Sequence, residues 1–128
     1  MKAISIQQPM ANWIACGYKT IEVRAWKHDY RGDLLICSTQ GDVEPAGVAL
    51  AIVDLKDVRP FEKGADEDAA CCNGDKKKYS FVLEWKGLLK HRFEVRGVRR
   101  IYNWDVTGKD LSFEDEDGCA TFEEEYNV

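Results

Sequence analysis

Short stretches in which apolar and polar residues alternate run through most of this chain, and this period of two is typical of β-strands. In the first stretch, residues 2–6, Ile4 and Ile6 fall on one face. Residues 34–37 instead form a continuous apolar run, which favours a strand buried on both faces. The same patterns predict further strands at about residues 20–24, 47–55 continuing toward residue 58, 79–85, 91–95 and 100–104.

One segment departs from this pattern and favours a helix. Met10, Trp13 and Ile14 recur at a spacing of three and four residues, which would bury one stripe of a two-turn helix over residues 9–16. The proline that opens the segment suits the first turn of a helix. Gly17 can adopt the left-handed conformation that closes a helix, so the helix is expected to end there.

The segments between these elements are rich in turn-forming and charged residues. Residues 31–33 (Arg-Gly-Asp) predict a turn, residues 40–47 a connection, and residues 60–78 a long loop with one helical turn. About six short strands and one clear helix between the first two predict an α+β, mostly β fold. The expected architecture is a small, mostly antiparallel barrel with a helix on one side.

Size and composition fit one globular domain. The chain has 128 residues, of which 45% are hydrophobic and 32% charged, as in globular rather than disordered proteins. No apolar run approaches membrane-spanning length, and the N-terminus becomes polar at Gln7 and Gln8, too early for a signal peptide. We therefore expect a cytoplasmic protein with no membrane partner.

Five cysteines and two histidines show no spacing typical of a metal site. No two cysteines have the Cys-x-x-Cys spacing, so we predict neither a metal nor a cofactor. Cys16 and Cys37 lie in apolar runs and are expected to be buried thiols, in keeping with a reducing compartment. Cys71 and Cys72 are adjacent in a polar loop, where a redox role is conceivable, although no cationic neighbour in sequence activates either thiol.

The net charge of −5 hides an asymmetry along the chain. Residues 110–128 hold eight of the 23 acidic residues and none of the 18 basic ones, which leaves 15 acidic against 18 basic residues before them. We therefore expect a domain at residues 1–108 and an acidic C-terminal tail at residues 109–128. The tail could be a solvated end, or it could lie over a basic surface and compete with an anionic ligand.

The segment after the predicted helix carries charged side chains on one face. Its apolar residues, Ile21 and Val23, share one face of the predicted strand, and the opposite face carries Thr20, Glu22 and Arg24. One face of such a strand packs on the core, and the other carries side chains that could bind or react with a ligand.

Lys19, Glu22 and Arg24 make a candidate site. A shielded lysine near an arginine could act as a base, and Arg24 offers a planar fork for phosphate or carboxylate. Glu22 could hold Lys19 or accept hydrogen bonds from a nucleobase amine. In a regular strand Lys19 and Glu22 point to opposite faces, so their convergence requires a turn or bulge. The three residues could equally form a structural salt-bridge cluster.

Aromatic residues and basic runs admit two interpretations. Trp13 could belong to the helix face that packs on the core or could be a stacking platform, while Trp26 could stack on a base or cap the barrel. The basic runs at residues 76–78, 90–92 and 99–100 could follow phosphates or could be solvated surface.

These residues together resemble the ASCH domain family. The resemblance rests on the Gly-x-Lys-Thr-x-Glu-x-Arg motif at residues 17–24, with residues 4–9 and 30–36 on either side, and covers roughly residues 3–104. ASCH domains share a PUA-like β-barrel, so the resemblance implies a PUA-like barrel with a short helix between its first two strands. It also implies a cleft lined by Lys19, Glu22 and Arg24, with Gln8, Trp13 and Arg31 nearby. Together with Trp26, which is a candidate from its place in a charged loop, these are the expected ligand-binding residues.

The resemblance also bears on catalysis. The family is generally thought to bind RNA, but one bacterial branch is similar to amidohydrolases that deacetylate N4-acetylcytidine. That branch retains the lysine matching Lys19, has a threonine where this chain has Glu22, and draws a glutamate from a later loop. If the protein is such an enzyme, Thr20 would have to replace the missing hydroxyl, and the catalytic residues would be Lys19, Thr20 and Glu22.

Three functions therefore remain open. The first, favoured by the basic body and by the resemblance, is binding of RNA or a modified nucleoside in the cleft. The alternative is a small-amide hydrolase of the N4-acetylcytidine amidohydrolase type. The second alternative is a protein-interaction module that binds a protein partner through the acidic tail.

Overall fold

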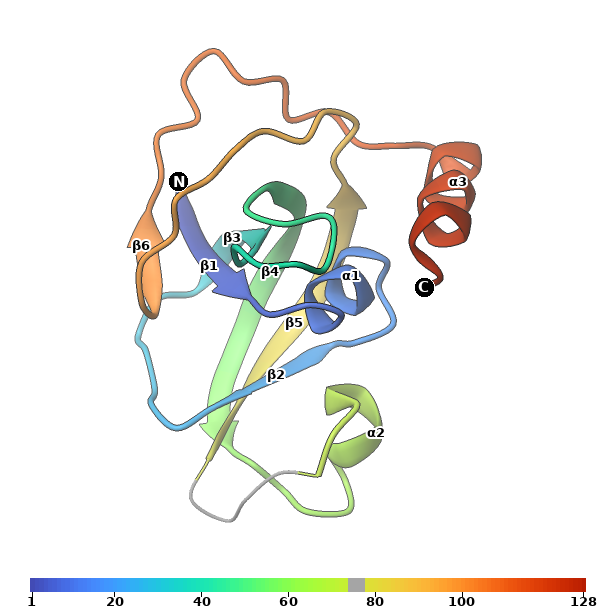
Figure 1. Cartoon of the computed structure of the whole chain (residues 1–128). Coiled ribbons are helices and arrows are strands. Elements are labelled where there is room, and N and C mark those ends of the chain that lie inside the picture. The colour runs from blue at the N-terminus through green and yellow to red at the C-terminus, as the bar shows by residue number, and fades with distance from the viewer. Residues whose placement is uncertain (74–77) are drawn as a thin grey trace.

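The computed structural model describes residues 1–73 and 78–128, and within them six strands form one sheet (Figure 1). The strands are β1 (Lys2–Ile6), β2 (Ile21–Arg24), β3 (Gly32–Ser38), β4 (Ala49–Pro60), β5 (Tyr79–Leu88) and β6 (Ile101–Asn103). The helices are α1 (Met10–Ala15), α2 (Glu67–Ala70) and α3 (Glu116–Tyr126). No helix in the described part of the chain is both long and apolar enough to cross a membrane.

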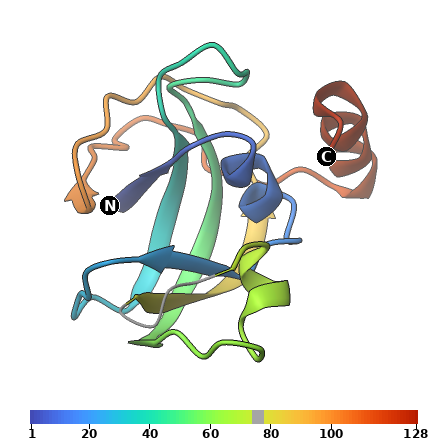
Figure 2. The same ribbon diagram turned by 60° about the horizontal axis from the view of Figure 1, so that its bottom comes forward.

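The sheet has the strand order β2-β5-β4-β3-β1-β6 and curls into a half-barrel. Only β1 and β3 are parallel, because α1 and β2 separate them in sequence, and the other neighbouring strands are antiparallel. Register shifts at Ile52/Val53 and Leu55/Asp57 interrupt the pairing of β4 with β5, and such bulges bend the strands that carry them. The predicted mostly β fold, with about six strands and a helix between the first two, is confirmed (Figure 2).

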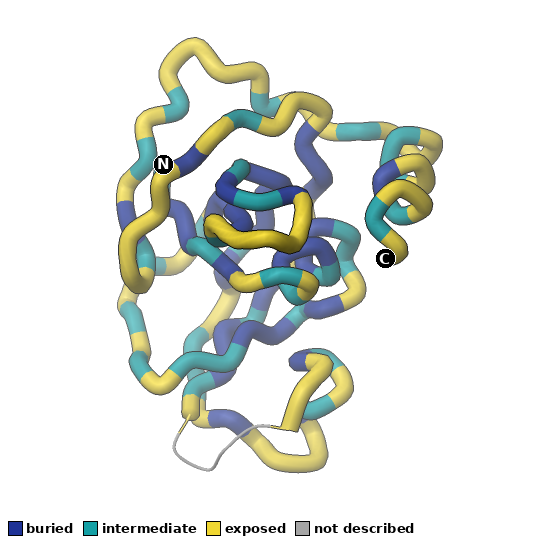
Figure 3. Tube along the Cα trace, viewed as in Figure 1, coloured by how far each residue is buried: buried dark blue, intermediate teal, exposed yellow. Residues whose placement is uncertain are grey.

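The core lies on both faces of the sheet, and β3 contributes to each. Leu34 and Ile36 pack with α1 in the larger cluster, whereas Leu35 and Cys37 belong to a second cluster on the other face. Figure 3 shows the buried positions gathered along the sheet and α1. The continuous apolar run was therefore correctly interpreted as a strand buried on both sides, and burial raises the pKa of Cys37 to about 12.

Three local predictions were wrong. The turn expected at residues 31–33 is already strand, because Gly32 and Asp33 pair with Leu55 and Asp54 of β4. The strand expected at residues 91–95 is absent from the described chain apart from one isolated bridge, and β4 and β5 are both longer than their apolar runs. For β3, β4 and β5, pairing with a neighbouring strand, rather than local pattern, decides where the strand begins and ends.

Helix α1 buries part of the predicted stripe, since Ile14 is buried and Met10 packs against the core. Its buried residues are Ala11, Asn12, Ile14 and Ala15, while Trp13 is only half-buried and lies outside the core clusters. Of the two interpretations left open for Trp13, the structure therefore does not support a place in the core clusters. Small alanine side chains line the buried face, and they let the helix approach the sheet closely.

The long loop between β4 and β5 contains the predicted helical turn, α2, and a buried carboxylate holds it in place. Asp66 receives two hydrogen bonds from Arg59, at 2.6 and 2.8 Å, and one each from the Glu62 amide and the Ser80 hydroxyl, both at 2.9 Å. These bonds, those from Arg59 first, hold the pKa of Asp66 well below its usual range. Of the basic run predicted at residues 76–78, Lys76 and Lys77 lie outside the described residues.

The acidic segment ends in α3, which packs against the body through one apolar side. Asp115 caps the helix by accepting a hydrogen bond from the Gly118 amide, and Phe122 is buried. The Arg92 guanidinium lies over the rings of Phe122 and Tyr126, at 5.6 and 5.5 Å. In Figures 1 and 2 the helix stands on the side opposite to β6 and the N-terminus. The division of the chain at residue 108 stays a prediction.

We predict that Asp66→Asn lowers the free energy of unfolding by about 2 to 3 kcal/mol, at the lower end of the range for buried pairs because the Arg59 side chain is 33% exposed. The measurement is urea denaturation at neutral pH, with Asp68→Asn, an exposed carboxylate of the same helix, as the control.

The pH dependence has a defined sign. Because folding lowers the pKa of Asp66, its stabilisation is fully present above the unfolded pKa of about 4 and is lost as the pH falls toward the native value. The difference in stability between wild type and Asp66→Asn should therefore shrink below about pH 4. A difference that grows on acidification would contradict this assignment.

Candidate functional site

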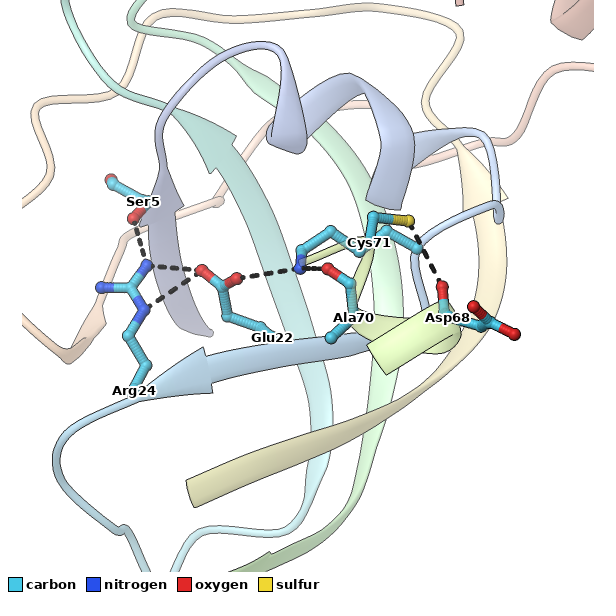
Figure 4. A network of polar contacts seen from close by, with 7 residues as sticks. Ser5, Glu22, Arg24, Asp68, Ala70 and Cys71 are labelled. Atoms are coloured by element: carbon cyan, nitrogen blue, oxygen red, sulfur yellow. Dashed lines mark hydrogen bonds and ion pairs between the residues drawn. The ribbon is translucent and has the colours of Figure 1, made fainter. Parts of the chain in front are cut away.

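The candidate site lies where the half-barrel stays open. β2 is an edge strand that pairs only with β5, and no backbone ladder joins it to β1 among the described residues. Side chains bridge this gap, which we call the seam: Arg24 of β2 donates a hydrogen bond from Nη2 to the Ser5 carbonyl of β1, at 3.2 Å. Figure 4 shows the guanidinium between the two strands.

Glu22 lies at the centre of the polar network in the seam. Its Oε2 accepts hydrogen bonds from Nε and Nη2 of Arg24, at 3.1 and 2.9 Å, and its Oε1 is 3.5 Å from Nζ of Lys19. The carboxylate is 9% exposed, so its interactions with both cations are largely shielded from water. The predicted convergence of Lys19, Glu22 and Arg24 is present in the structure (Figure 4).

The end of α1 explains how Lys19 reaches Glu22 despite its position in sequence. Gly17 has φ +86°, its amide donates to the Ile14 carbonyl, and the Tyr18 amide donates to the Trp13 carbonyl. This is the hydrogen-bond pattern of a Schellman motif. The Lys19 amide bonds to the same Trp13 carbonyl, so Lys19 belongs to the turn and not to the strand. The turn required at the strand entrance is therefore found.

Lys19 also links the seam to α2. Its side chain is 1% exposed, and Nζ donates a hydrogen bond to the carbonyl of Ala70, the last residue of α2. No buried side-chain nitrogen or oxygen in the described chain lacks a hydrogen-bond partner. The Lys19 ammonium is thus held by two acceptors, one from β2 and one from the long loop.

A cavity of about 580 Å³ opens onto this network. Its lining includes Lys19, Glu22 and Arg24, together with residues 97–100, which precede β6. Among the described residues its lining includes one carboxylate, Glu22, and five basic residues: Lys19, Arg24, Lys78, Arg99 and Arg100. The cavity is therefore strongly basic in a chain whose net charge is −5.

Trp26 arranges two of these arginines. The guanidinium of Arg24 lies 6.0 Å from the centre of its ring and that of Arg100 lies 5.4 Å from it. The indole and the Phe81 ring pack in a T-shaped arrangement with centroids 4.9 Å apart. Trp26 is not among the residues that line the cavity, so in this structure it supports the arginines instead of offering a face to a ligand.

Four other residues predicted for the site do not line the cavity. Gln8 bonds to Asn12 and to the Pro45 carbonyl, and Arg31 donates to the carbonyls of its own loop. Trp13 is on α1, and Thr20 contributes backbone hydrogen bonds to its neighbours. The part of these four residues in ligand binding stays a prediction.

Other residues of the cavity wall escaped the sequence-based prediction. Ser5, Thr39 and Gly97 are close in space only because β1, the end of β3 and the segment before β6 meet at the seam. In the sequence, only the basic pair Arg99 and Arg100 could have indicated this part of the cavity wall. Cys72 also lines the cavity, and no group of three or more metal-ligating side chains occurs in the described residues.

Comparison with known proteins agrees with this architecture. The family model described as the ASCH domain matches residues 4–126. A tyrosine-to-phenylalanine mutant of ZmASCH from Zymomonas mobilis superposes with a TM-score of 0.60 and 12% identity, covering 94% of each chain. A serine-to-alanine mutant of ZmASCH superposes at 0.59 and 10%, covering 94% of this chain and 92% of that one. No curated protein matches the chain.

We predict that Lys19→Met lowers the free energy of unfolding by about 3 kcal/mol, because Glu22 loses a cationic partner and the Ala70 carbonyl loses its donor inside the protein. Urea denaturation measures the change, and Lys63→Met, at an exposed lysine, is the matched control. Equal stability of the two variants would show that the Lys19 contacts contribute nothing to the fold.

Proposed function

The chain belongs to the ASCH domain family, and from this premise we propose that it binds RNA or a modified nucleoside in the basic cavity at the seam. The observation that carries the proposal is the charge of that cavity. Among the described residues, five basic side chains and one carboxylate line a cavity of about 580 Å³, a volume within the range of small-ligand sites. A ligand with a phosphate is the natural counterpart of such a wall.

The network around Glu22 leaves the cavity positive. One carboxylate offsets one of its two cationic partners, so the trio of Lys19, Glu22 and Arg24 keeps a net positive charge. Glu22 uses Nε and Nη2 of Arg24, while Nη1 has no hydrogen-bond partner in the described part of the chain. Arg24 is thus oriented by the protein and retains a donor for a ligand.

The part of the cavity wall formed by residues 97–100 supplies groups suited to a nucleotide. Arg99 is exposed and makes no hydrogen bond or ion pair with the described residues, so its guanidinium is available to a phosphate. Val98 beside it is 65% exposed and lines the same cavity, which gives a ligand an apolar contact. Proteins that bind single-stranded nucleic acid combine positive charge along the backbone with side chains that contact the bases, and here Arg99 supplies the charge.

The amidohydrolase alternative finds less support in this arrangement. A general base needs a free electron pair, but Nζ of Lys19 faces two acceptors, the Glu22 carboxylate and the Ala70 carbonyl. Thr20, the replacement nucleophile, does not line the cavity. In the protein-interaction alternative the acidic tail would do the binding, yet α3 already uses Phe122 to pack on the body.

We predict that the protein binds a short single-stranded RNA and that Arg99→Ala weakens this binding about tenfold, because one charge-assisted contact to a phosphate is lost. The slope of log affinity against log salt should fall by about 0.7, the value for one phosphate contact to a single strand. The measurement is fluorescence anisotropy at two salt concentrations, with Lys63→Ala, an exposed lysine outside the cavity, as the control.

A second assay addresses the alternatives. The protein is incubated with N4-acetylcytidine, and deacetylation is followed by absorbance beside a Lys19→Met control. Turnover that disappears in the variant would replace the binding proposal with the hydrolase. If the protein neither deacetylates N4-acetylcytidine nor binds RNA or the nucleoside, the protein-interaction module is the remaining alternative.

A further inference from the structure

A second cavity of about 660 Å³ adjoins the basic one. Three residues, Ser5, Thr39 and Gly97, line both cavities, so the two are chambers of one groove with a shared boundary. We call the cavity at the seam the inner chamber and the second cavity the outer chamber. Besides the shared residues, the outer chamber is lined by Ser38, Gln40, Val95 and Arg96.

Gly97 forms the boundary because the backbone there approaches β1 too closely for a side chain. A Cβ at this position would collide with the Ser5 hydroxyl and would also come within 2.7 Å of the Tyr102 hydroxyl. These two hydroxyls share a hydrogen bond of 2.6 Å, so neither can move aside freely. The absence of a side chain at Gly97 therefore lets this segment pack directly against β1 at the boundary that the two chambers share.

A single segment, residues 95–100, lines both chambers. Arg96 lines the outer chamber, and Val98, Arg99 and Arg100 line the inner one. The segment is anchored where Val95 is buried and its amide donates to the Gly47 carbonyl at 2.9 Å. Arg96 is exposed and has no ion pair or hydrogen bond to any described residue. Within this segment, Arg96 thus serves the outer chamber and Arg99 and Arg100 serve the inner chamber, on either side of Gly97.

We infer that the ligand of this groove is a single-stranded RNA segment of at least two nucleotides, and not a free nucleoside. This inference rests on the proposed function and deepens it. One nucleotide occupies the inner chamber with its phosphate at Arg99, the backbone passes over Gly97, and the next nucleotide enters the outer chamber beside Arg96. Each chamber by itself has the volume of a small-ligand site, so a monomer fills only one of them.

The chemistry at the boundary suits a ribose. Thr39 lines both chambers, and its hydroxyl has no hydrogen-bond partner among the described residues. A 2′-hydroxyl of the passing backbone both donates and accepts, so it can pair with this group, whereas deoxyribose cannot. A duplex presents no splayed bases to two separate chambers, and this excludes double-stranded ligands from the arrangement.

The test compares ligands of increasing length on the full chain. Uridine 5′-monophosphate and 5′-phosphorylated oligouridylates of two, four and eight nucleotides are titrated by competition against a labelled octanucleotide. For the wild type we expect a gain in affinity of about tenfold from the monomer to the dinucleotide, as one further phosphate contact is made. Arg96→Ala should remove most of this gain and leave the affinity for the monomer unchanged.

Two matched variants make the outcome specific. Arg99→Ala should weaken the monomer and the oligonucleotides alike, because it acts in the inner chamber, and Lys63→Ala should change neither. If the wild type binds monomer and dinucleotide equally, or if Arg96→Ala has the same effect as Lys63→Ala, the inference is wrong while the proposed function stands. If no uridylate of any length binds, the RNA-binding proposal and the inference fail together.

Discussion

The buried carboxylate of Glu22 is the interaction on which the seam depends. The sheet stops at β2, and in place of a backbone ladder the gap to β1 is bridged by Arg24, which Glu22 orients. The same carboxylate faces Lys19, whose ammonium reaches the loop that contains α2. Removing one partner from such a network leaves an uncompensated charge in a shielded place, so its members depend on one another.

Two ordinary pieces of local structure bring this network together. The Schellman turn after α1 places Lys19 beside β2, and Asp66 anchors the loop whose Ala70 carbonyl accepts from Lys19. Neither piece contacts a ligand in our proposal. They determine the shape of the cavity by holding Lys19 and the loop that contains α2 in place. The exposed segment around Arg99 can then add positive charge to the cavity without having to stabilise the fold.

The similarity to ZmASCH shows that the fold survives wide divergence in sequence, since identity is 12% at a TM-score of 0.60. Fold alone does not decide function, because one barrel can hold different site chemistry. Here the chemistry follows from Glu22. A carboxylate between two cations makes a stable, positively charged wall, whereas a hydroxyl at the same position would leave Lys19 without a counter-charge.

The sequence by itself determined the features that depend on neighbours along the chain. Period-two alternation located β1, β2 and β5, the glycine at position 17 located the end of α1, and strand parity placed Glu22 and Arg24 on one face. Locally encoded features of this kind follow from the covalent geometry of the backbone and need no knowledge of the fold.

Only the tertiary structure decided which residues face the ligand. Lys19 meets the Ala70 carbonyl 51 positions away, and Gly97 meets Ser5 because β1 lies between β3 and the strand that follows Gly97. Trp26 lies beside two arginines, whereas its loop position left open whether it stacks on a base or caps the barrel. Bulges, strand order and the open edge of the sheet set these contacts, and they arise from packing between distant segments that no local pattern records.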